Sequence, residues 1–444
     1  MKVGYNPSGG CGMGVVLSKY KKVLHYIQNN SPVDKSSIAA ALGISLMTVN
    51  KIVNRLQEKS IVIQCGKQEG GNGRRSDLFK FNPDLFLSIG LDIDEDRIIV
   101  AAVNSDGVPI SQQEYRYNGD QDRPYSTENI IIGIESYCSL FMQQHGILPE
   151  TIASIGVAPH GIIDTANGRC LLGTHLGGII DLNLRDELEM HIGTPVYVND
   201  PARALAYYER KYGHGKKVNN FIYIFMDKGV GSGIVIDGKI HLGASGMAGE
   251  IGHIIVSENG ERCKCGNYGC LETVASEGSI IRQVRKGIED GVMTKILDYC
   301  DGNIEDIDLH VLKEAADNKD KFALNILDSI GSNLGKAISV LINLFNPELI
   351  FLGGQVAVLG QHLLEPALRV MQHNSLNLMG ESAQIEVVEH DPFKECIGIA
   401  IEAFDVLFNG LDCRASQNGS TSKAADGLEP HSFLDKLLRD IVSE

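Results

Sequence analysis

The chain has 444 residues, of which 43% are hydrophobic and 22% are charged, and it carries a net charge of −16 at pH 7. This composition is typical of a globular protein with several domains, and it excludes an intrinsically disordered chain. No apolar run reaches the roughly 20 residues that span a bilayer, and the N-terminus lacks the apolar segment of a signal peptide. We therefore expect a cytoplasmic protein.

The charge is unevenly divided along the chain. Residues 1–80 contain twelve Lys or Arg and four Asp or Glu, whereas the rest of the chain contains 28 and 52. A basic segment joined to an acidic body is typical of a nucleic-acid-binding module attached to a second domain. On charge alone, a basic domain that binds no nucleic acid remains an alternative.

The basic segment begins with the pattern of a helical domain. A Gly-rich N-terminus, residues 1–16, is predicted to be disordered, and the domain is expected at residues 17–82. Apolar periodicity predicts a first helix at Tyr20–Asn29. A second helix is predicted at Lys35–Leu42, because Asp34 can cap its first turn.

A tight turn leads from there into a third helix. Gly43 suits the left-handed conformation that ends a helix, and Ser45 can cap the next one. Apolar residues at helical spacing define the core face of the third helix: Val49, Ile52, Val53 and Leu56. Two helices joined in this way form a helix-turn-helix, whose second helix binds the major groove of DNA. The polar residues predicted to contact DNA are Ser45, Thr48, Asn50, Lys51, Asn54 and Arg55.

Two short strands follow the third helix. They are predicted at Ile61–Cys65 and Asp77–Phe81, and a Gly-rich loop with Arg74 and Arg75 joins them. Such a hairpin is typical of the wing of a winged helix-turn-helix, and paired arginines suit a narrow minor groove. A solvated loop with incidental charge is the alternative for this loop taken alone.

The remainder of the chain alternates strands and helices, which indicates an α/β fold. A strand–turn–strand pattern at residues 88–107 returns at residues 220–238, and helix-forming sequence follows each copy. This repeat predicts a duplicated body with a cleft between two lobes. We expect the first lobe at residues 83–200, with a returning helix at 390–410, and the second lobe at 201–389.

Three cysteines and a histidine form the most specific pattern in the sequence. Cys263, Cys265 and Cys270 lie close together, and His253 precedes them. Three thiolates and one imidazole are a closed tetrahedral ligand set for Zn²⁺, with no open position for a catalytic water. We therefore predict a structural zinc ion in the second lobe. The other seven of the ten cysteines are expected to be ordinary core or surface residues.

Polar side chains near this cluster suit the recognition of a sugar. They follow an apolar strand or flank the metal motif: Asn199, Asp200, Glu250 and Glu272. Carboxylates and amides at strand ends can bind paired hydroxyl groups, and Asp200 could act as a general base on a hydroxyl. Any one of them could be a solvated loop residue, but their joint occurrence favours a sugar site.

The C-terminal segment, residues 411–444, is expected to be a flexible tail with a short amphipathic helix. Polar and small residues at 413–431 are typical of a linker. Apolar residues at helical spacing then follow: Leu434, Leu437, Leu438 and Ile441. The pattern does not indicate what this apolar face packs against.

Several of these motifs resemble those of the ROK family, which groups sugar-responsive repressors with sugar kinases. The sequence GEIGHIIVSENGERCKCGNYGCLE, at residues 249–272, is similar to the signature of that family. PHGIIDTANG at 159–168 resembles its PGxVD…G segment, and VNDPARALAYYE at 198–209 resembles its NDANxxAxxE segment. NPELIFLGG at 346–354 resembles the segment on the adenosine side of the nucleotide, and the resemblance covers residues 18–410.

The resemblance implies a fold, a cofactor and an assembly. The fold is an α/β body with two lobes of the actin-like, ribonuclease-H-like ATPase type, preceded here by the winged helix-turn-helix of the repressor branch. Zinc would shape the sugar site, and the chain would form dimers or dimers of dimers. By position, the sugar ligands would be Asn199, Asp200, Glu250, His253 and Glu272.

Kinase activity is the main alternative within the family. Asp200 stands at the position of the base in the kinases. The kinases carry DxGGT in the first hairpin, where glycine amides hold phosphate, whereas residues 92–96 of this chain read DIDED. Residues 227–229 read DKG where the kinases tend to have GTG. We therefore expect poor or no ATP binding, and no catalytic residue.

These features predict a sugar-responsive regulator, a repressor by resemblance, of genes for carbohydrate uptake or metabolism. Its partners would be operator DNA and a sugar or sugar phosphate. The alternative is an ATP-dependent sugar kinase with a DNA-binding head. His160 and Val198 depart from the family's usual glycine and glutamate, so the identity of the sugar stays open. A protein effector, such as a component of a sugar transporter, also stays open.

Overall fold

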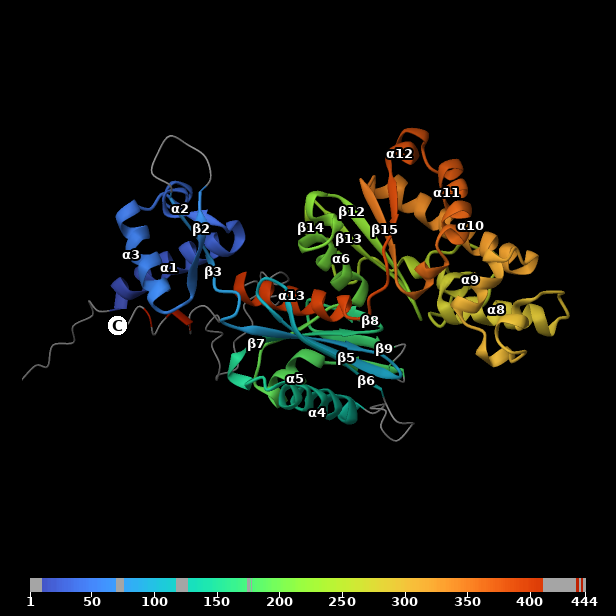
Figure 1. Cartoon of the computed structure of the whole chain (residues 1–444), viewed down its shortest axis with the longest axis horizontal. Helices are drawn as coiled ribbons and strands as arrows, with labels where there is room; N and C mark the ends of the chain where they lie inside the picture. The colour runs from blue at the N-terminus through green and yellow to red at the C-terminus, as the bar shows by residue number, and fades with distance from the viewer. Residues whose placement is uncertain are drawn as a thin grey trace, which may run out of the picture.

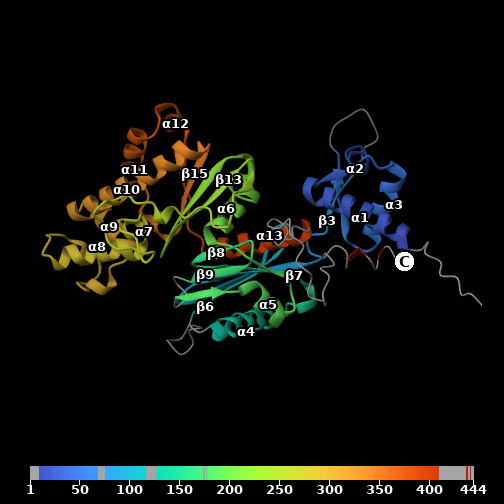
Figure 2. The same cartoon turned by 180° about the vertical axis from the view of Figure 1, so that it is seen from behind.

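The structure is a computed structural model that describes residues 10–68, 76–116, 127–173, 176, 178–409, 437–438 and 441. A small head lies at one end of the molecule, beside the first of two α/β lobes (Figure 1). The second lobe lies on the opposite side from the head in both views (Figure 2). Within the described residues, no helix is long and apolar enough to cross a membrane.

The head is a winged helix-turn-helix. Its helices are α1 (Gly10–Asn30), α2 (Lys35–Leu42) and α3 (Leu46–Glu58). Its three-stranded sheet has the order β1-β3-β2 and consists of β1 (Val33–Asp34), β2 (Val62–Lys67) and β3 (Asp77–Phe81). The predicted caps are confirmed, because Asp34 accepts hydrogen bonds from the first turn of α2, Gly43 ends that helix with a φ of +64°, and Ser45 caps α3.

Two predictions for the head need correction. Helix α1 begins at Gly10, so the predicted disorder of residues 1–16 is wrong for residues 10–16, while residues 1–9 lie outside the described part of the chain. Extending an existing helix adds a hydrogen bond for each residue that is ordered, whereas starting one is costly, so glycines next to a packed helix can still be helical. Strand β2 ends at Lys67, later than predicted, because a bulge at Gln64 and Gly66 continues its pairing with β3.

The two lobes repeat one topology. The first sheet has the order β11-β7-β4-β5-β6, and the second has the equivalent order β16-β15-β12-β13-β14. In each sheet the hairpin strands pair antiparallel, and the other two strands are added in parallel on the far side of the first hairpin strand. The duplication predicted from the two hairpin patterns is thereby confirmed.

The bounds of the strands are as follows. The first sheet contains β4 (Leu87–Ile93), β5 (Arg97–Asn104), β6 (Pro109–Arg116), β7 (Ile152–Pro159) and β11 (Val196–Val198). The second sheet contains β12 (Phe221–Met226), β13 (Val230–Ile236), β14 (Lys239–Ile240), β15 (Leu349–Gly353) and β16 (Gln384–Val387). A small sheet at the edge of the first lobe contains β8 (Ile162–Asp164), β9 (Arg169–Gly173) and β10 (Ile179–Leu182).

Helices cover both faces of each sheet. On the first sheet, α4 (Thr127–His145) and α5 (Leu184–Ile192) cover one face, and α13 (Lys394–Asn409) covers the other. On the second sheet, α6 (Pro201–Lys211) covers one face. Its other face is covered by a helical layer that contains α7 (Glu272–Ala275), α8 (Glu277–Glu289), α9 (Leu309–Asp317), α10 (Lys321–Phe345) and α11 (Gln361–Asn374), and α12 (Asn377–Ser382) follows α11.

The sequence of each hairpin explains this sandwich. In β12, alternate residues face opposite sides of the sheet, so Ile222 and Ile224 pack on the helical layer while Tyr223 and Phe225 pack on the α6 side. Because both faces are covered, a central strand such as β12 is apolar throughout, whereas the edge strand β6 is largely polar and partly exposed.

The described part of the tail packs on the head. Leu438 is fully buried and Ile441 is 5% exposed, in a cluster with Phe404 and Phe408 of α13 and the core of the head. Leu437 packs at the margin of this cluster, while Leu434 and the predicted linker lie outside the described residues. The apolar face predicted for the tail therefore contacts this chain's own head.

Candidate metal centre, effector cleft and DNA-binding surface

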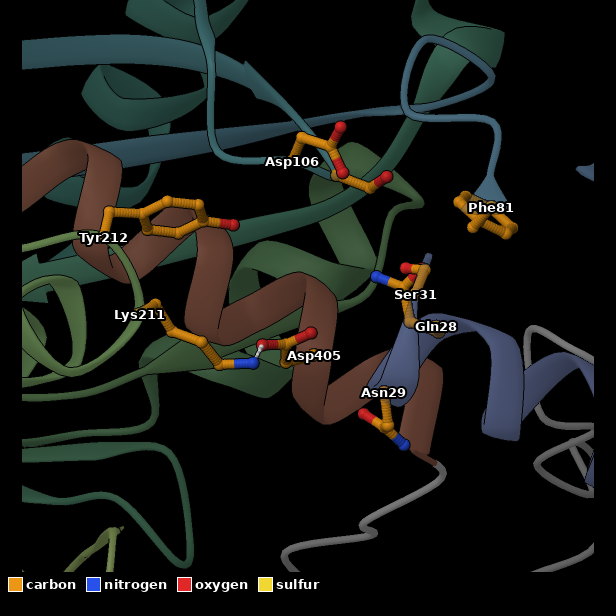
Figure 3. A pocket seen from close by; sticks show the side chains of 9 residues that line it. Gln28, Asn29, Ser31, Phe81, Asp106, Lys211, Tyr212 and Asp405 are labelled. Atoms are coloured by element: carbon orange, nitrogen blue, oxygen red, sulfur yellow. Dashed lines mark ion pairs between the residues drawn. The ribbon is translucent and has the colours of Figure 1, made fainter. Parts of the chain in front are cut away.

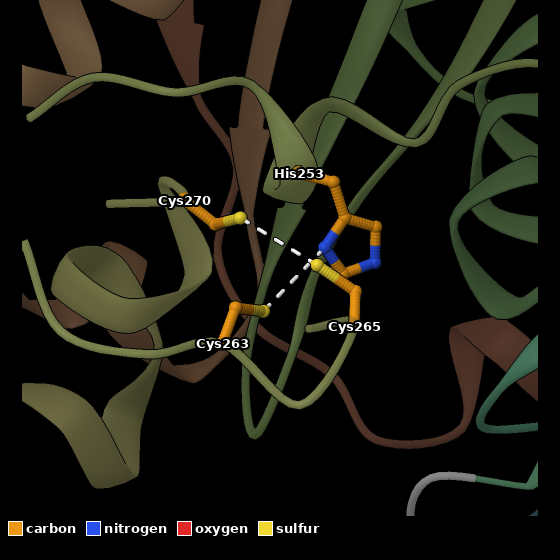
Figure 4. A group of neighbouring side chains, drawn as sticks. All are labelled: His253, Cys263, Cys265 and Cys270. Carbon is orange, nitrogen blue, oxygen red and sulfur yellow. Dashed lines mark hydrogen bonds between the residues drawn. The ribbon is translucent and has the colours of Figure 1, made fainter. Parts of the chain in front are cut away.

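The predicted metal ligands converge in the second lobe. His253 follows β13 in the loop that runs to the cysteines, and the ligand atoms of His253, Cys263, Cys265 and Cys270 all lie within 4.8 Å of one another (Figure 4). Sγ of Cys263 lies 3.7 Å from Nδ1 of His253, and Sγ of Cys265 lies 3.7 Å from Sγ of Cys270.

These distances fit a tetrahedral zinc ion. Two thiolates that each lie about 2.3 Å from one ion at the tetrahedral angle are about 3.8 Å apart. Backbone hydrogen bonding brings the ligands of the loop together, because isolated antiparallel β-bridges join Ile255 to Cys270 and Arg262 to Tyr268. Gly269 has a φ of +71°, and a Cβ there would lie 1.7 Å from the carbonyl oxygen of Ser257. The donor set and the loop geometry therefore fit a four-coordinate metal ion.

A cleft lies directly beside this centre. The first lobe contributes His160, Gly161, Ile162 and Leu172 to its lining, and the second lobe contributes the turn between β12 and β13 together with the metal loop. Four of the five predicted sugar ligands line this cleft, together with Lys264: Asp200, Glu250, His253 and Glu272. Nε2 of His253 lies 4.0 Å from Oε2 of Glu250, so this histidine joins the metal centre to the cleft.

The carboxylates in the cleft are held by local structure. Asp200 caps α6, because its Oδ1 accepts hydrogen bonds from the backbone of Ala202 and Arg203. Oε2 of Glu272 accepts a hydrogen bond from the backbone of Val230 at 3.3 Å. Burial and the negative charge of Asp200 raise the pKa of Glu250 to about 7. Clustered acceptors of this kind suit the paired hydroxyl groups of a sugar.

Asn199 does not line the cleft. Its side chain is fully buried, and its Nδ2 donates to both oxygens of Glu402 in α13 while its Oδ1 accepts from Thr165. In this structure the residue therefore holds the strand end in place instead of offering a hydrogen bond to a ligand. The sequence pattern could not indicate this, because Glu402 is 203 residues away in the chain.

His160 is a residue of the cleft that the sugar prediction missed. It lies at the end of β7, and its Nε2 is 2.8 Å from Oδ1 of Asp92, which is 3% exposed. Burial lowers the pKa of His160, but the charges of Asp92 and Asp94 outweigh burial and raise it to about 10. The sequence had marked His160 as a departure from the family pattern, but not as a residue that lines the cleft.

The two hairpin turns that would hold nucleotide phosphates are joined to each other. Lys228, in the turn between β12 and β13, places its Nζ 2.8 Å from Asp94 and 2.6 Å from Asp96, both in the turn between β4 and β5. A cation from the opposite lobe thus offsets part of the negative charge of the acidic turn. The paired lysine and carboxylate side chains occupy the space between the two turns.

The DNA-binding surface predicted on α3 is partly exposed. Lys51 and Asn54 are exposed, Thr48, Asn50 and Arg55 are half-buried, and α3 lies on the side of the head away from the body (Figures 1 and 2). Ser45 is exposed, but its hydroxyl caps α3 through the backbone of Thr48. Arg74 and Arg75 lie outside the described residues.

Two of these side chains already have partners within the head. Nζ of Lys35 in α2 lies 2.6 Å from Oδ1 of Asn54, and Arg55 pairs with Glu58 at 3.1 Å. The prediction missed Met47, which is 81% exposed on the first turn of α3. An apolar side chain exposed there suits contact with a thymine methyl group.

Known protein families match both the head and the body of this chain. The ROK family model matches residues 88–401, and a winged helix-turn-helix DNA-binding model matches residues 21–63. The xylose repressor of Caldicellulosiruptor bescii is 28% identical over 365 residues, which cover 82% of this chain and 90% of that protein. The two family models thus give a DNA-binding head before a ROK body.

Solved structures show the same architecture. The crystal structure of a ROK family transcriptional regulator, a homologue of the E. coli Mlc protein, has a TM-score of 0.75 and 26% identity, and the match covers 89% of this chain and 98% of that one. A ROK family glucokinase from Streptomyces griseus, solved with glucose and AMPPNP, has a TM-score of 0.62 and 25% identity, and covers 72% of this chain and 99% of its own. The predicted fold, a winged helix-turn-helix followed by an actin-like body, is confirmed. The chain belongs to the ROK family.

Proposed function

We propose that this protein is a sugar-responsive, DNA-binding transcriptional repressor of genes for carbohydrate uptake or metabolism. One observation carries the proposal: the same chain contains a helix-turn-helix head and a two-lobed body. The cleft of that body is lined by Asp200, Glu250 and Glu272, beside a Cys/His centre. The xylose repressor among its relatives supports a sugar as the effector. Operator DNA and the effector would meet the protein in the cytoplasm.

The Cys/His centre would hold a structural Zn²⁺ ion. Zinc bound there would neutralise the thiolates and fix the loop that carries His253, while leaving the chemistry of the cleft to the protein's own side chains. Asp200, Glu250 and Glu272 would accept hydrogen bonds from sugar hydroxyl groups, and Lys264 would meet an anionic substituent such as a phosphate. Arg74 and Arg75 of the wing would add contacts to the minor groove.

We propose that the body does not act as a kinase. The ion pairs of Lys228 with Asp94 and Asp96 support this, because they link the two turns across the space where phosphates would lie. The competing proposal, an ATP-dependent sugar kinase, is supported by Asp200, which retains the position of a base. A coupled assay for ADP release over a panel of sugars separates the two, and sugar-dependent turnover would refute the repressor proposal in its present form.

The protein would act as a homodimer or a dimer of dimers. A helix-turn-helix protein that binds a palindrome needs two heads about 34–36 Å apart. Exposed apolar residues where α10 ends and α12 begins offer a surface for a second copy: Leu344, Leu376 and Leu378. Sedimentation of the Leu344→Asp variant tests this, and an unchanged oligomeric mass would remove that surface from consideration.

Thermal unfolding of the purified protein provides the first test. The panel contains D-xylose, D-glucose, N-acetyl-D-glucosamine, their phosphates, and ATP. A ligand present at 100 times its dissociation constant stabilises the native state by about 2.7 kcal/mol, which gives a visible shift. A shift with one sugar and none with ATP supports the proposal, and the same sugar should then weaken binding to an operator selected from random DNA. No shift with any sugar would direct the search to a protein effector, such as a component of a sugar transporter.

A further inference from the structure

Two helices, α6 and α13, lie against each other between the sheets of the two lobes (Figure 1). Helix α6 packs on the second sheet and α13 on the first. A Cβ on Gly398 of α13 would lie 2.2 Å from the carbonyl oxygen of Ala204 in α6, so the two helices are in close contact. On its other side α13 rests on Gly90 and Gly156 of the first sheet, where added Cβ atoms would lie 1.8 and 2.3 Å from its carbonyl oxygens. The pair is therefore one direct contact between the lobes, in addition to the ion pairs of Lys228.

The middle of α13 is bound to the wall of the cleft. Glu402 is 4% exposed and accepts hydrogen bonds from Nδ2 of Asn199 at 3.0 and 3.1 Å and from the hydroxyl of Tyr197 at 3.0 Å. Asn199 directly precedes Asp200, which lines the cleft and caps the start of α6. A displacement of Asp200 by a ligand is therefore passed to α13 through this buried carboxylate.

The C-terminal end of α13 lies inside the core of the head. The ring of Phe408 lies 5.3 Å from that of Phe81 and 5.4 Å from that of His25, and Phe404 lies 6.2 Å from Phe81. Glu402 and Phe408 are six residues apart on one helix, a distance of about 9 Å. A single rigid element thus joins the effector cleft to the DNA-binding head.

Beside this apolar contact the head and body enclose a polar hollow (Figure 3). Lys211, at the end of α6, lies there with its Nζ 2.7 Å from Oδ2 of Asp405 in α13. At the same junction Lys80 of the head pairs with Asp106 of the first lobe at 2.7 Å. The Lys80–Asp106 pair, which joins the head to the body, is partly exposed and holds the head weakly, whereas the Phe404 and Phe408 contacts are closely packed. The head can therefore tilt about the end of α13.

We infer that the α6–α13 pair transmits closure of the lobes to the DNA-binding head, with Glu402 as the positioning residue that ties α13 to Asn199, just before the start of α6. The inference rests on the proposed function and names the regulation of that same cleft. A ligand that draws the lobes together slides α6 along α13, and the bonds between Asn199 and Glu402 carry the shift to the helix that enters the head. In a dimer, the tilt changes the spacing of the two heads and hence their fit to the operator.

The Glu402→Gln variant tests this coupling. Glutamine keeps the volume of the side chain but turns one acceptor oxygen into a donor, which opposes Nδ2 of Asn199. The control is Glu209→Gln, since Glu209 is equally buried on α6 but accepts a hydrogen bond from the backbone of His214, away from α13. For each protein we measure the dissociation constant for the selected operator duplex, with and without the sugar that stabilises the wild type.

We expect the sugar to weaken operator binding of the wild type and of Glu209→Gln by at least about fivefold, and that of Glu402→Gln by less than about twofold. Glu402→Gln should still bind the sugar and, without sugar, the operator. A full sugar response in Glu402→Gln overturns the inference. If Glu402→Gln does not fold, Phe408→Leu at the other end of the path must show the same selective loss, and a full response there overturns the inference instead.

A second measurement separates this inference from the proposed function. If no sugar changes operator binding by the wild type, the proposed sugar response fails. The coupling is then tested by measuring how operator DNA, instead of a sugar, affects the two helices. Operator binding should then change amide hydrogen exchange in α6 and α13 of the wild type, and leave α6 unchanged in Glu402→Gln. Unchanged exchange in both helices of the wild type overturns the inference.

Discussion

Replacing Lys228 by methionine tests whether ion pairs between the two hairpin turns hold the lobes together. Methionine retains the apolar stem of lysine but removes its charge. Lys228 is 26% exposed, and its partners differ in burial, since Asp94 is 3% exposed and Asp96 is 43% exposed. The substitution should therefore act mainly by leaving the buried carboxylate of Asp94 without its lysine partner.

The expected loss follows from the pKa of Asp94. Burial raises this pKa, but the charges of His160 and Lys228 outweigh burial and lower it to about 2, from an ordinary 3.8. That shift corresponds to about 2.5 kcal/mol of stability for all partners of Asp94 together. Breaking a fully buried pair costs about 3–5 kcal/mol, and partial exposure of Lys228 reduces the cost, so we expect about 2 kcal/mol. For a lobe of this size the melting temperature should fall by about 4–8 °C.

Scanning calorimetry of the Lys228→Met protein at pH 6 measures this loss. Lys239→Met, at an exposed lysine of β14, is the matched control and should change nothing. Because the folded pKa of Asp94 is depressed, its contribution is present above pH 4 and disappears as the pH falls toward 2, so the two melting temperatures should converge in acid. Adding Asp94→Asn to Lys228→Met should restore much of the loss. Equal melting temperatures of Lys228→Met and wild type at pH 6 would refute the reasoning.

Four further changes have definite expected outcomes. Cys265→Ser should abolish stoichiometric zinc binding, measured by elemental analysis, and lower the melting temperature. The control Cys65→Ser, on β2, should do neither. Zinc retained by Cys265→Ser would contradict the ligand assignment. Lys51→Ala should weaken operator binding and reduce the slope of log Kd against log salt by about 1, and an unchanged slope would remove this phosphate contact. The pKa of His160 is raised to about 10, so its imidazolium stabilises the fold below pH 6.5 and loses this effect as the pH rises toward 10. The unfolding free energy of His160→Asn should therefore depend less on pH between 7 and 10 than that of the wild type. Parallel pH profiles of the two proteins would contradict this. Leu438→Ala should destabilise the head by about 2–5 kcal/mol, seen as an earlier calorimetric transition, because the side chain is fully buried against it; an unchanged transition would show that the tail does not dock in solution.

Local features of the head could be predicted almost residue by residue. The bounds of α2, its cap at Asp34 and the left-handed Gly43 all follow from interactions within a few residues. The start of α1 at Gly10 could not be predicted, because glycine content is a weak guide beside an established helix.

The part of the candidate site whose residues are close in the sequence could be predicted. His253 and the three cysteines lie within one loop region, and the metal geometry needs only that loop to close. The role of Asn199 was predicted less well, because an asparagine at a strand end can face either the cleft or the core. The partner that buries it, Glu402, comes from a helix at the other end of the chain.

The helix-turn-helix, the repeated hairpins and the metal motif could be predicted from the amino-acid sequence, because capping, periodicity and ligand spacing are properties of neighbouring residues. The ion pair of Lys228 with Asp94 in the other lobe, and the course of α13 from the cleft into the head, became visible only in the folded protein. Such contacts depend on how two sheets and their covering helices pack, and burial then makes each charge and hydrogen bond count for more than it would in water. The proposed path from effector to DNA is therefore a property of packing that no local pattern contains.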